Sequence, residues 1–132
     1  MSHHREPVTA IGAPAAIGPY SHAVSAGGLL FCSGQIPLDP DTDSLVGDTP
    51  AEQAAQCLRN LQSVCAAAGA SLQDAVRCTV YLTDLAGTFA DVNGAYAEFF
   101  AADPPARVAV GVAALPKGAQ VEIDAIVALP TG

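Results

Sequence analysis

The chain has 132 residues, of which 51% are apolar and 14% are charged, so it fits one folded domain spanning residues 1–132. This apolar share excludes a disordered tail, and no apolar run reaches the roughly 20 residues of a membrane-spanning helix. The formal net charge is −8, from 13 acidic and 5 basic side chains. Because the basic residues are scattered, one copy of the chain cannot build a positive stripe. Nucleic acids and anionic membranes are therefore excluded as expected partners.

The four cysteines are expected to be reduced core residues of a cytoplasmic protein. No two of them stand at CxxC spacing, and all lie in apolar stretches: Cys32, Cys57, Cys65 and Cys78. Only Cys78 has a basic neighbour, Arg77, and in a strand these two side chains point to opposite faces. We therefore expect no disulfide and no metal site.

The N-terminal segment carries little pattern. Residues 1–7 have no apolar stretch behind Arg5, which argues against a secretory signal. Residues 1–12 are expected to form a loosely ordered lead-in, with a short strand around 8–11. A tight turn is expected at 17–21, because Gly and Pro occur together there.

A β-hairpin is expected next. Strands are predicted at 22–26 and 29–33, joined by Gly27 and Gly28, which suit a two-residue turn. Residues 37–47 then form a polar, acidic loop.

A strong helix start follows this loop. Thr49 can cap the helix, Pro50 suits its first turn, and Glu52 stands three residues after Thr49 as in a capping box. Gly69 is a natural stop. Apolar residues recur at helical spacing between these ends and predict one buried stripe: Ala51, Ala54, Ala55, Leu58, Leu61, Cys65 and Ala68.

The second half of the chain predicts three strands and one helix. Residues 76–82 alternate with period two, and a helix is expected from 83 or 84 to about 103. Strands at 107–112 and 120–129 are joined by a turn at 115–118. Two helices among five or six strands indicate an α+β domain, with a mostly antiparallel sheet and the helices packed on one face.

The strand at 107–112 is the first candidate for a binding site. Its three valines are expected to face the helices, so that three other residues point the opposite way: Arg107, Ala109 and Gly111. Two residues with almost no side chain leave room beside a guanidinium, which suits a carboxylate through two parallel hydrogen bonds. An ordinary ion pair at a subunit contact fits equally well. The sheet face left open by the helices also predicts a homo-oligomer.

The last strand places two carboxylates away from the core. Val121, Ile123 and their alternate neighbours are expected to face inward, and Glu122 and Asp124 outward. Each carboxylate is either a solvated surface charge or a general acid/base whose pKa rises on desolvation at an interface. The pattern by itself favours the surface charge.

Four further polar residues give weaker signals. Tyr20 fits either a core aromatic or a site residue, and Ser33 fits a simple bond to the backbone. His22 has no Asp and Ser at triad spacing, which favours a structural role. Asn93 adjoins the apolar stripe of the second helix, which consists of Phe89, Val92, Tyr96, Phe99 and Phe100. Neither a phosphate-binding glycine loop nor a helical metal-binding pair of His occurs.

Four motifs follow one another along the chain: IGPYSHAV at 17–24, FCSGQIPLDP at 31–40, PAR at 105–107 and LPKGAQVEIDAI at 115–126. In this order they resemble the RidA (YjgF/YER057c/UK114) family. The resemblance runs from about residue 13 to residue 127, which is nearly the whole chain.

The resemblance implies a chorismate-mutase-like fold of the bacillus type, assembled as a homotrimer with the helices outside and three clefts between subunits. It also implies hydrolytic deamination of reactive 2-imino or enamine acids, such as 2-iminopropanoate or its tautomer 2-aminoacrylate, to 2-keto acids and ammonia. Such imines are made by PLP enzymes, which implies a role in metabolite damage control.

The same resemblance assigns residues to the site. The carboxylate-binding arginine of the family falls on Arg107, and its water-activating glutamate on Glu122. The tyrosine, serine and asparagine that line the family's cleft fall on Tyr20, Ser33 and Asn93.

The chain departs from the family pattern at three positions. Members with deaminase activity often carry Ser-Cys after the arginine, where this chain has Val108 and Ala109. A backbone contribution at that position would still come from Ala109, which is therefore expected to line the substrate site. His22 stands where Gln is common. These departures concern the substrate range more than the fold.

The first expectation is therefore an imine/enamine deaminase that needs neither metal nor cofactor. The alternative is a non-catalytic trimeric binding module for small carboxylates and keto acids. Arg107 serves both functions, so Glu122 is the residue that separates them. A ribonuclease or an inhibitor of translation, to which the family has also been linked, ranks third because the net charge is −8.

Overall fold

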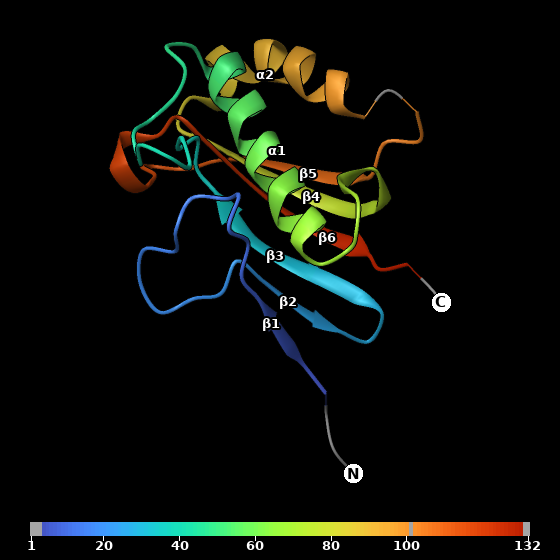
Figure 1. The fold of residues 1–132 in the computed structure, drawn as a ribbon. Helices are drawn as coiled ribbons and strands as arrows, with labels where there is room; N and C mark the ends of the chain where they lie inside the picture. The colour runs from blue at the N-terminus through green and yellow to red at the C-terminus, as the bar shows by residue number, and fades with distance from the viewer. Residues whose placement is uncertain (1–3, 101, 131–132) are drawn as a thin grey trace.

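A six-stranded mixed β-sheet with two helices on one face makes up the described part of the chain, residues 4–100 and 102–130 of a computed structural model (Figure 1). The sheet order is β1-β2-β3-β6-β4-β5; β4 and β5 pair in parallel, and the other neighbours pair antiparallel. The α+β class is thereby confirmed. The elements are β1 (Glu6–Val8), β2 (Ala23–Ala26), β3 (Leu29–Gln35), α1 (Pro50–Ala67), β4 (Ala75–Leu82), α2 (Leu85–Phe99), β5 (Ala106–Gly111) and β6 (Val121–Ala128).

Local sequence signals account for the hairpin and for the first helix. Gly27 and Gly28 both adopt positive φ, 59° and 81°, which the tight turn between β2 and β3 requires. The Thr49 Oγ accepts a hydrogen bond from the backbone N–H of Glu52 at 3.2 Å, and α1 begins as predicted. Gly69, with φ of 72°, ends it.

The short strand of the lead-in lies earlier than expected. It occupies Glu6–Val8 rather than the region around 8–11, and it pairs with β2. After Val8 the chain leaves the sheet, because the backbone N–H of Ala10 bonds to the His22 ring at 2.9 Å instead of a neighbouring strand. Part of the segment predicted to be loosely ordered is thus tied to the domain.

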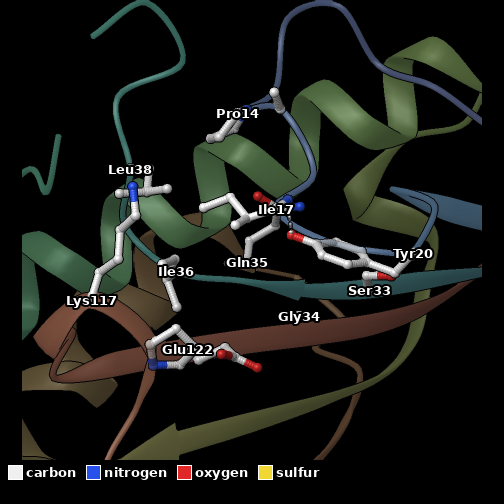
Figure 2. A pocket seen from close by; sticks show the side chains of 12 residues that line it. Pro14, Ile17, Tyr20, Ser33, Gly34, Gln35, Ile36, Leu38, Lys117 and Glu122 are labelled. Atoms are coloured by element: carbon white, nitrogen blue, oxygen red, sulfur yellow. Dashed lines mark hydrogen bonds between the residues drawn. The ribbon is translucent and has the colours of Figure 1, made fainter. Parts of the chain in front are cut away.

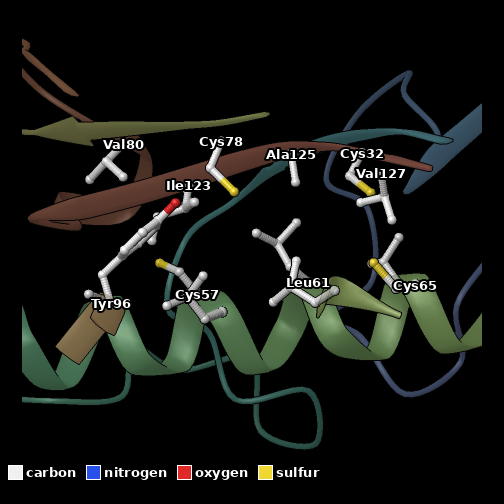
Figure 3. Packing of buried hydrophobic residues seen from close by; sticks show 14 of the residues in the cluster. Cys32, Cys57, Leu61, Cys65, Cys78, Val80, Tyr96, Ile123, Ala125 and Val127 are labelled. Atoms are coloured by element: carbon white, nitrogen blue, oxygen red, sulfur yellow. The ribbon is translucent and has the colours of Figure 1, made fainter. Parts of the chain in front are cut away.

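The core fills the space between the helices and the sheet (Figure 3). All four cysteines lie in it as free thiols, as the sequence predicted. Burial raises the pKa of the Cys57 thiol, and it raises that of Cys78 to about 11. A thiol with so high a pKa is a poor nucleophile near neutral pH, which agrees with a structural role.

Three polar side chains of α1 also lie in the interior, where the apolar stripe did not predict them. Gln53 donates to the carbonyl of Gly47 at 3.2 Å, and Asn60 donates to that of Leu38 at 3.0 Å. Gln56 donates to the Asn60 side-chain oxygen at 2.9 Å. These bonds hold the acidic loop against α1, so the segment around Leu38 has a fixed position.

The orientation predicted for β5 is wrong. In the parallel register Cys78 stands opposite Arg107, and Val80 opposite Ala109, so both β5 residues face the helices with the buried side of β4. Gly111 lies on the same side, where a Cβ would come within 3.3 Å of the Leu85 Cβ. The absence of a side chain at Gly111 thus makes room for the start of α2. The alternation of a strand has the same period whichever side is buried, so it could not reveal this.

The open face of the sheet consequently carries other side chains than those expected. Val108 is 36% exposed and Phe31 is 44% exposed there. Val76, which alternation places on the same face as Cys78 and Val80, is exposed because the β4–β6 register is irregular between Ala75 and Arg77. The described residues contain no helix with the length and hydropathy to cross a membrane.

Candidate functional site

One half of the predicted site lines a cavity of about 440 Å³ at the end of β3 (Figure 2). Five residues with polar side chains line it: Tyr20, Ser33, Gln35, Lys117 and Glu122. Most of the remaining wall is apolar and comes from the lead-in, from the segment after β3 and from the turn before β6: Pro14, Ala15, Ile17, Ile36, Leu38 and Pro116.

Burial of its neighbours fixes the direction of Glu122. Val121 and Ile123 are fully buried toward the helices, so Glu122 projects from the opposite face of β6, as predicted. Its carboxylate lies beside Gly34, where a Cβ would overlap it. The missing side chain of Gly34 is therefore what admits the carboxylate to this place.

The surroundings change the acidity of Glu122. Burial raises the pKa of its carboxyl group, and the negative charge of nearby Asp124 adds to the rise. Asp124 itself is held by two hydrogen bonds, from the Thr79 backbone N–H at 3.1 Å and from the Tyr81 hydroxyl at 3.0 Å. Of the two carboxylates, Glu122 is the one that lines the cavity and can exchange a proton there.

Hydrogen bonds to the backbone hold the wall of this cavity. The Ser33 hydroxyl donates to the Ser21 carbonyl at 2.6 Å, and the Tyr20 hydroxyl accepts from the Ile17 N–H at 3.2 Å. The buried His22 ring accepts from Ala10 through Nδ1 and donates to the Pro14 carbonyl through Nε2 at 2.7 Å. His22 is therefore structural, as the sequence favoured.

The other half of the predicted site surrounds Arg107 on the helix side of the sheet. Its Nη1 donates to the Asn93 Oδ1 at 2.6 Å. The guanidinium carbon lies 5.4 Å from the ring centre of Phe89 and 5.0 Å from that of Tyr96. The sequence had assigned these rings only to the buried stripe of α2. Phe89, Asn93 and Tyr96 stand at i, i+4 and i+7, so they share one face of α2. This spacing was the sequence signal that could have indicated the face that contacts Arg107.

Arg107 has no carboxylate partner among the residues that the structure describes. The ion pair found among the described residues joins Lys117 to Asp43 at 3.6 Å. An exposed guanidinium that is already oriented by an amide and two rings can take an anion through its remaining N–H groups. An ion pair between Arg107 and a second copy of the chain, the alternative that the sequence left open, stays a prediction.

The two halves do not meet within one copy of the chain. Arg107 and Ala109 point to the helix side of the sheet, whereas Glu122 and Ser33 belong to the other side. One face thus offers a site for an anion and the other a carboxylate of raised pKa. Across the described ranges, no group of three or more His, Cys, Asp or Glu is placed to hold a metal ion.

Comparison with known proteins gives consistent matches along the chain. The family model described as Endoribonuclease L-PSP matches residues 10–129. The RutC family protein y4sK of Sinorhizobium fredii is 52% identical over 124 residues, covering 94% of this chain and 98% of that protein. The 2-iminobutanoate/2-iminopropanoate deaminase of Mus musculus is 44% identical over 122 residues, covering 92% and 90%.

Solved structures agree with these matches. The crystal structure of RidA from the Antarctic bacterium Psychrobacter sp. PAMC 21119 superposes with a TM-score of 0.89 at 43% identity. The superposition covers 94% of this chain and 99% of that one. At this identity the likeness extends beyond the fold to the family.

Replacing Gly34 with alanine tests how the Glu122 carboxylate is placed. The added methyl group should push the carboxylate toward solvent, so the pKa of Glu122 should fall toward its ordinary value, because burial is the main cause of the rise. Titration of the Glu122 carboxyl carbon by NMR measures this. Gly94→Ala, at a helical glycine with open space around it, is the matched control and should leave the titration unchanged. An unchanged titration in Gly34→Ala would contradict this placement.

Proposed function

The chain belongs to the RidA (YjgF/YER057c/UK114) family, and from this premise we propose that it hydrolyses reactive 2-imino and enamine acids to 2-keto acids and ammonia. The substrates are of the 2-iminopropanoate and 2-aminoacrylate class, made by PLP enzymes. The observation that carries the proposal is Glu122, a carboxyl group of raised pKa in a mostly apolar cavity. A binding module would need the free guanidinium of Arg107 but not this group.

A second copy of the chain completes the proposed site. Because Arg107 and Glu122 point to opposite sides of one sheet, the Arg107 half of one copy must lie over the Glu122 half of another. A head-to-tail contact closes into a ring when the rotation between copies adds up to a full turn, and we propose a homotrimer with three such sites. The half-exposed apolar side chains of the open sheet face support an interface there: Phe31, Val76 and Val108.

The chemistry needs few groups, because a protonated imine is already an electrophile. Arg107, oriented by Asn93, binds the substrate carboxylate and fixes the position of the imine carbon. Glu122 takes a proton from a water molecule as the water oxygen bonds to that carbon, and the electron pair of the C=N double bond moves to nitrogen. The product of this step is a neutral carbinolamine.

The second stage expels ammonia. Protonated Glu122 gives its proton to the amine nitrogen, the C–N bond breaks, and the hydroxyl proton returns to Glu122 as the ketone forms. Ammonia then takes this proton and leaves as ammonium. Tyr20, Ser33 and the backbone of Ala109 line the space around the reacting carbon in this proposal. A general acid/base of this kind contributes on the order of 10²–10⁴-fold in rate.

Replacing Glu122 and Arg107 one at a time tests whether the first acts as the base and the second binds the carboxylate. The assay couples a PLP dehydratase, which makes the imine from Ser or Thr, to 2-keto acid formation. Glu122→Gln keeps the shape but cannot take a proton, so turnover should fall by about 10²-fold or more while 2-keto acid binding persists. Arg107→Lys loses the planar fork, and affinity for the carboxylate should fall about ten- to a hundred-fold.

The controls are the same substitutions at exposed positions outside the proposed site, Glu98→Gln on α2 and Arg5→Lys before β1. Both variants should behave like the wild type. Binding of 2-keto acids without turnover of any 2-imino acid by the wild type would replace the deaminase with a non-catalytic binding module. A salt-dependent affinity for RNA in the micromolar range would instead support a ribonuclease function. The five basic residues are scattered and provide no positive surface for RNA.

Mixing two inactive variants tests whether the site is shared between copies. Arg107→Ala and Glu122→Gln, produced together, should form mixed trimers. One of the three sites in each mixed trimer, which is about a quarter of all sites in an equal mixture, joins an intact Arg107 of one copy to an intact Glu122 of its neighbour. Activity should reappear to that extent, and light scattering should give three copies of the 13.2 kDa chain. Trimers without any recovered activity would mean that no site joins residues of two copies.

The pH dependence of activity tests the influence of Asp124 on Glu122. The negative charge of Asp124 disfavours the ionised form of Glu122, so Asp124→Asn should lower the pKa of Glu122. Because the ionised form is the base, the acid limb of the kcat/KM profile should move to lower pH. Asp91→Asn, at an exposed carboxylate of α2, should not move it. A shift to higher pH would contradict the assignment of Glu122 as the base.

A further inference from the structure

The buried ring of His22 holds both ends of a turn at residues 10–14. The backbone N–H of Ala10 donates to Nδ1 at 2.9 Å, and Nε2 lies 2.7 Å from the carbonyl oxygen of Pro14. Within the turn, the Ala13 N–H donates to the Ala10 carbonyl at 3.3 Å. The bonds to His22 are the two that join this turn to another part of the described chain.

These two partners determine the protonation of the ring. A backbone N–H can only donate, so Nδ1 carries no proton, and a carbonyl oxygen can only accept, so Nε2 carries one. The ring that fits both partners is therefore neutral. A doubly protonated ring would place an N–H group at Nδ1 opposite the N–H of Ala10, and that hydrogen bond would be lost.

The same segment forms part of the wall of the Glu122 cavity (Figure 2). Pro14, Ala15 and Ile17 line this cavity, and Pro14 is bonded directly to the His22 ring. The position of this wall therefore depends on the two hydrogen bonds of the ring, and both bonds depend on the proton that the ring carries.

Few titratable groups surround the ring. The strands β2 and β3 carry no acidic or basic residue, and Glu6 of β1 is exposed. On α1, Ser63 packs beside the turn, and Arg59 bonds within its own helix. A cavity of about 340 Å³ adjoins the ring, and Tyr20 is its one titratable lining residue besides His22. None of these groups is a carboxylate that would hold a second proton on the ring in place.

We propose that His22 is a positioning residue for the Glu122 cavity and makes the wall at residues 10–17 sensitive to pH. A neutral ring holds the turn against the domain, and a protonated ring releases it, so that ligands bind less tightly under acidic conditions. The inference adds regulation to the proposed function, and it rests on that function in taking this cavity as the binding site.

The direction of the pH effect follows from proton counting. The charge of a histidine ordinarily changes between about pH 5 and 8. The held turn excludes the second ring proton and the released turn admits it, so falling pH favours release, by at most about ten-fold per pH unit for one proton. Protonation of Glu122 removes the base in the same direction. Binding of a 2-keto acid, which does not need that base, separates the two effects.

Glutamine at position 22 separates the hydrogen bonds from the charge. The amide of His22→Gln can accept from Ala10 through its oxygen and donate to Pro14 through its nitrogen, but it does not titrate. In calorimetry, the affinity of the wild type for pyruvate should fall about ten-fold from about pH 7.5 to about pH 5. In His22→Gln it should change by less than about two-fold. His4→Gln, the same substitution at an exposed position before β1, should keep the wild-type pH dependence.

Hydrogen exchange at the Ala10 amide, followed by NMR, reports on the turn itself and needs no ligand. Its protection, corrected for the intrinsic effect of pH on exchange, should fall on acidification in the wild type and stay constant in His22→Gln. If it does so while the wild type hydrolyses no imine, the proposed function fails and the role of His22 stands.

Other results would overturn the role of His22. The same pH dependence of pyruvate affinity in the wild type and in His22→Gln would show that the ring proton does not act on the cavity. Constant protection of Ala10 in the wild type over this pH range would show that the turn is never released, and this result decides the question even if His22→Gln does not fold.

Discussion

The packing of β6 against the helices is the constraint on which the rest of the molecule depends. This strand lies between β3 and β4, and its alternate side chains, Val121, Ile123, Ala125 and Val127, are at most 1% exposed. A slip of one residue would exchange these side chains with the carboxylates of Glu122 and Asp124, at a prohibitive cost in desolvation. The register is therefore fixed, and with it the direction of both carboxylates.

The two reactive groups of the proposed site lie on different faces of this sheet. Arg107 faces α2, where Asn93 and two aromatic rings orient it, and Glu122 faces the open side, where burial raises its pKa. In the proposed trimer, catalysis requires assembly, because a copy without a neighbour holds only half of each site. The neighbour would also remove water from Glu122, which acts on its pKa in the same direction as the burial already present.

Buried polar side chains hold the loop segments that line the Glu122 cavity. Asn60 fixes the segment around Leu38, and His22 fixes the lead-in at Ala10 and Pro14 through both ring nitrogens. Satisfied hydrogen bonds of this kind give loops one conformation, because an unpaired buried group would be costly. Loops that carry apolar wall residues can thus line a site with nearly the precision of the sheet.

The sequence by itself determined the features that depend on neighbouring residues. The cap at Thr49, the glycine turn at 27–28 and the alternation of β6 predicted their elements and the outward direction of Glu122. The four motifs identified the family, and with it the candidate residues of the site. The sequence did not predict that Gln and Asn side chains of α1 are buried, because the carbonyl groups that accept their hydrogen bonds lie outside the helix in the preceding segment.

Only the tertiary structure decided which face of β5 is covered. In an alternating strand either of the two faces can be the buried one. For β5 the parallel pairing with β4 decides this, because it sets Cys78 opposite Arg107. That pairing joins residues that are distant in sequence, so no local signal carries it. It turned Arg107 toward α2 rather than toward Glu122, and the absence of a side chain at Gly111 allows the helix to approach this face.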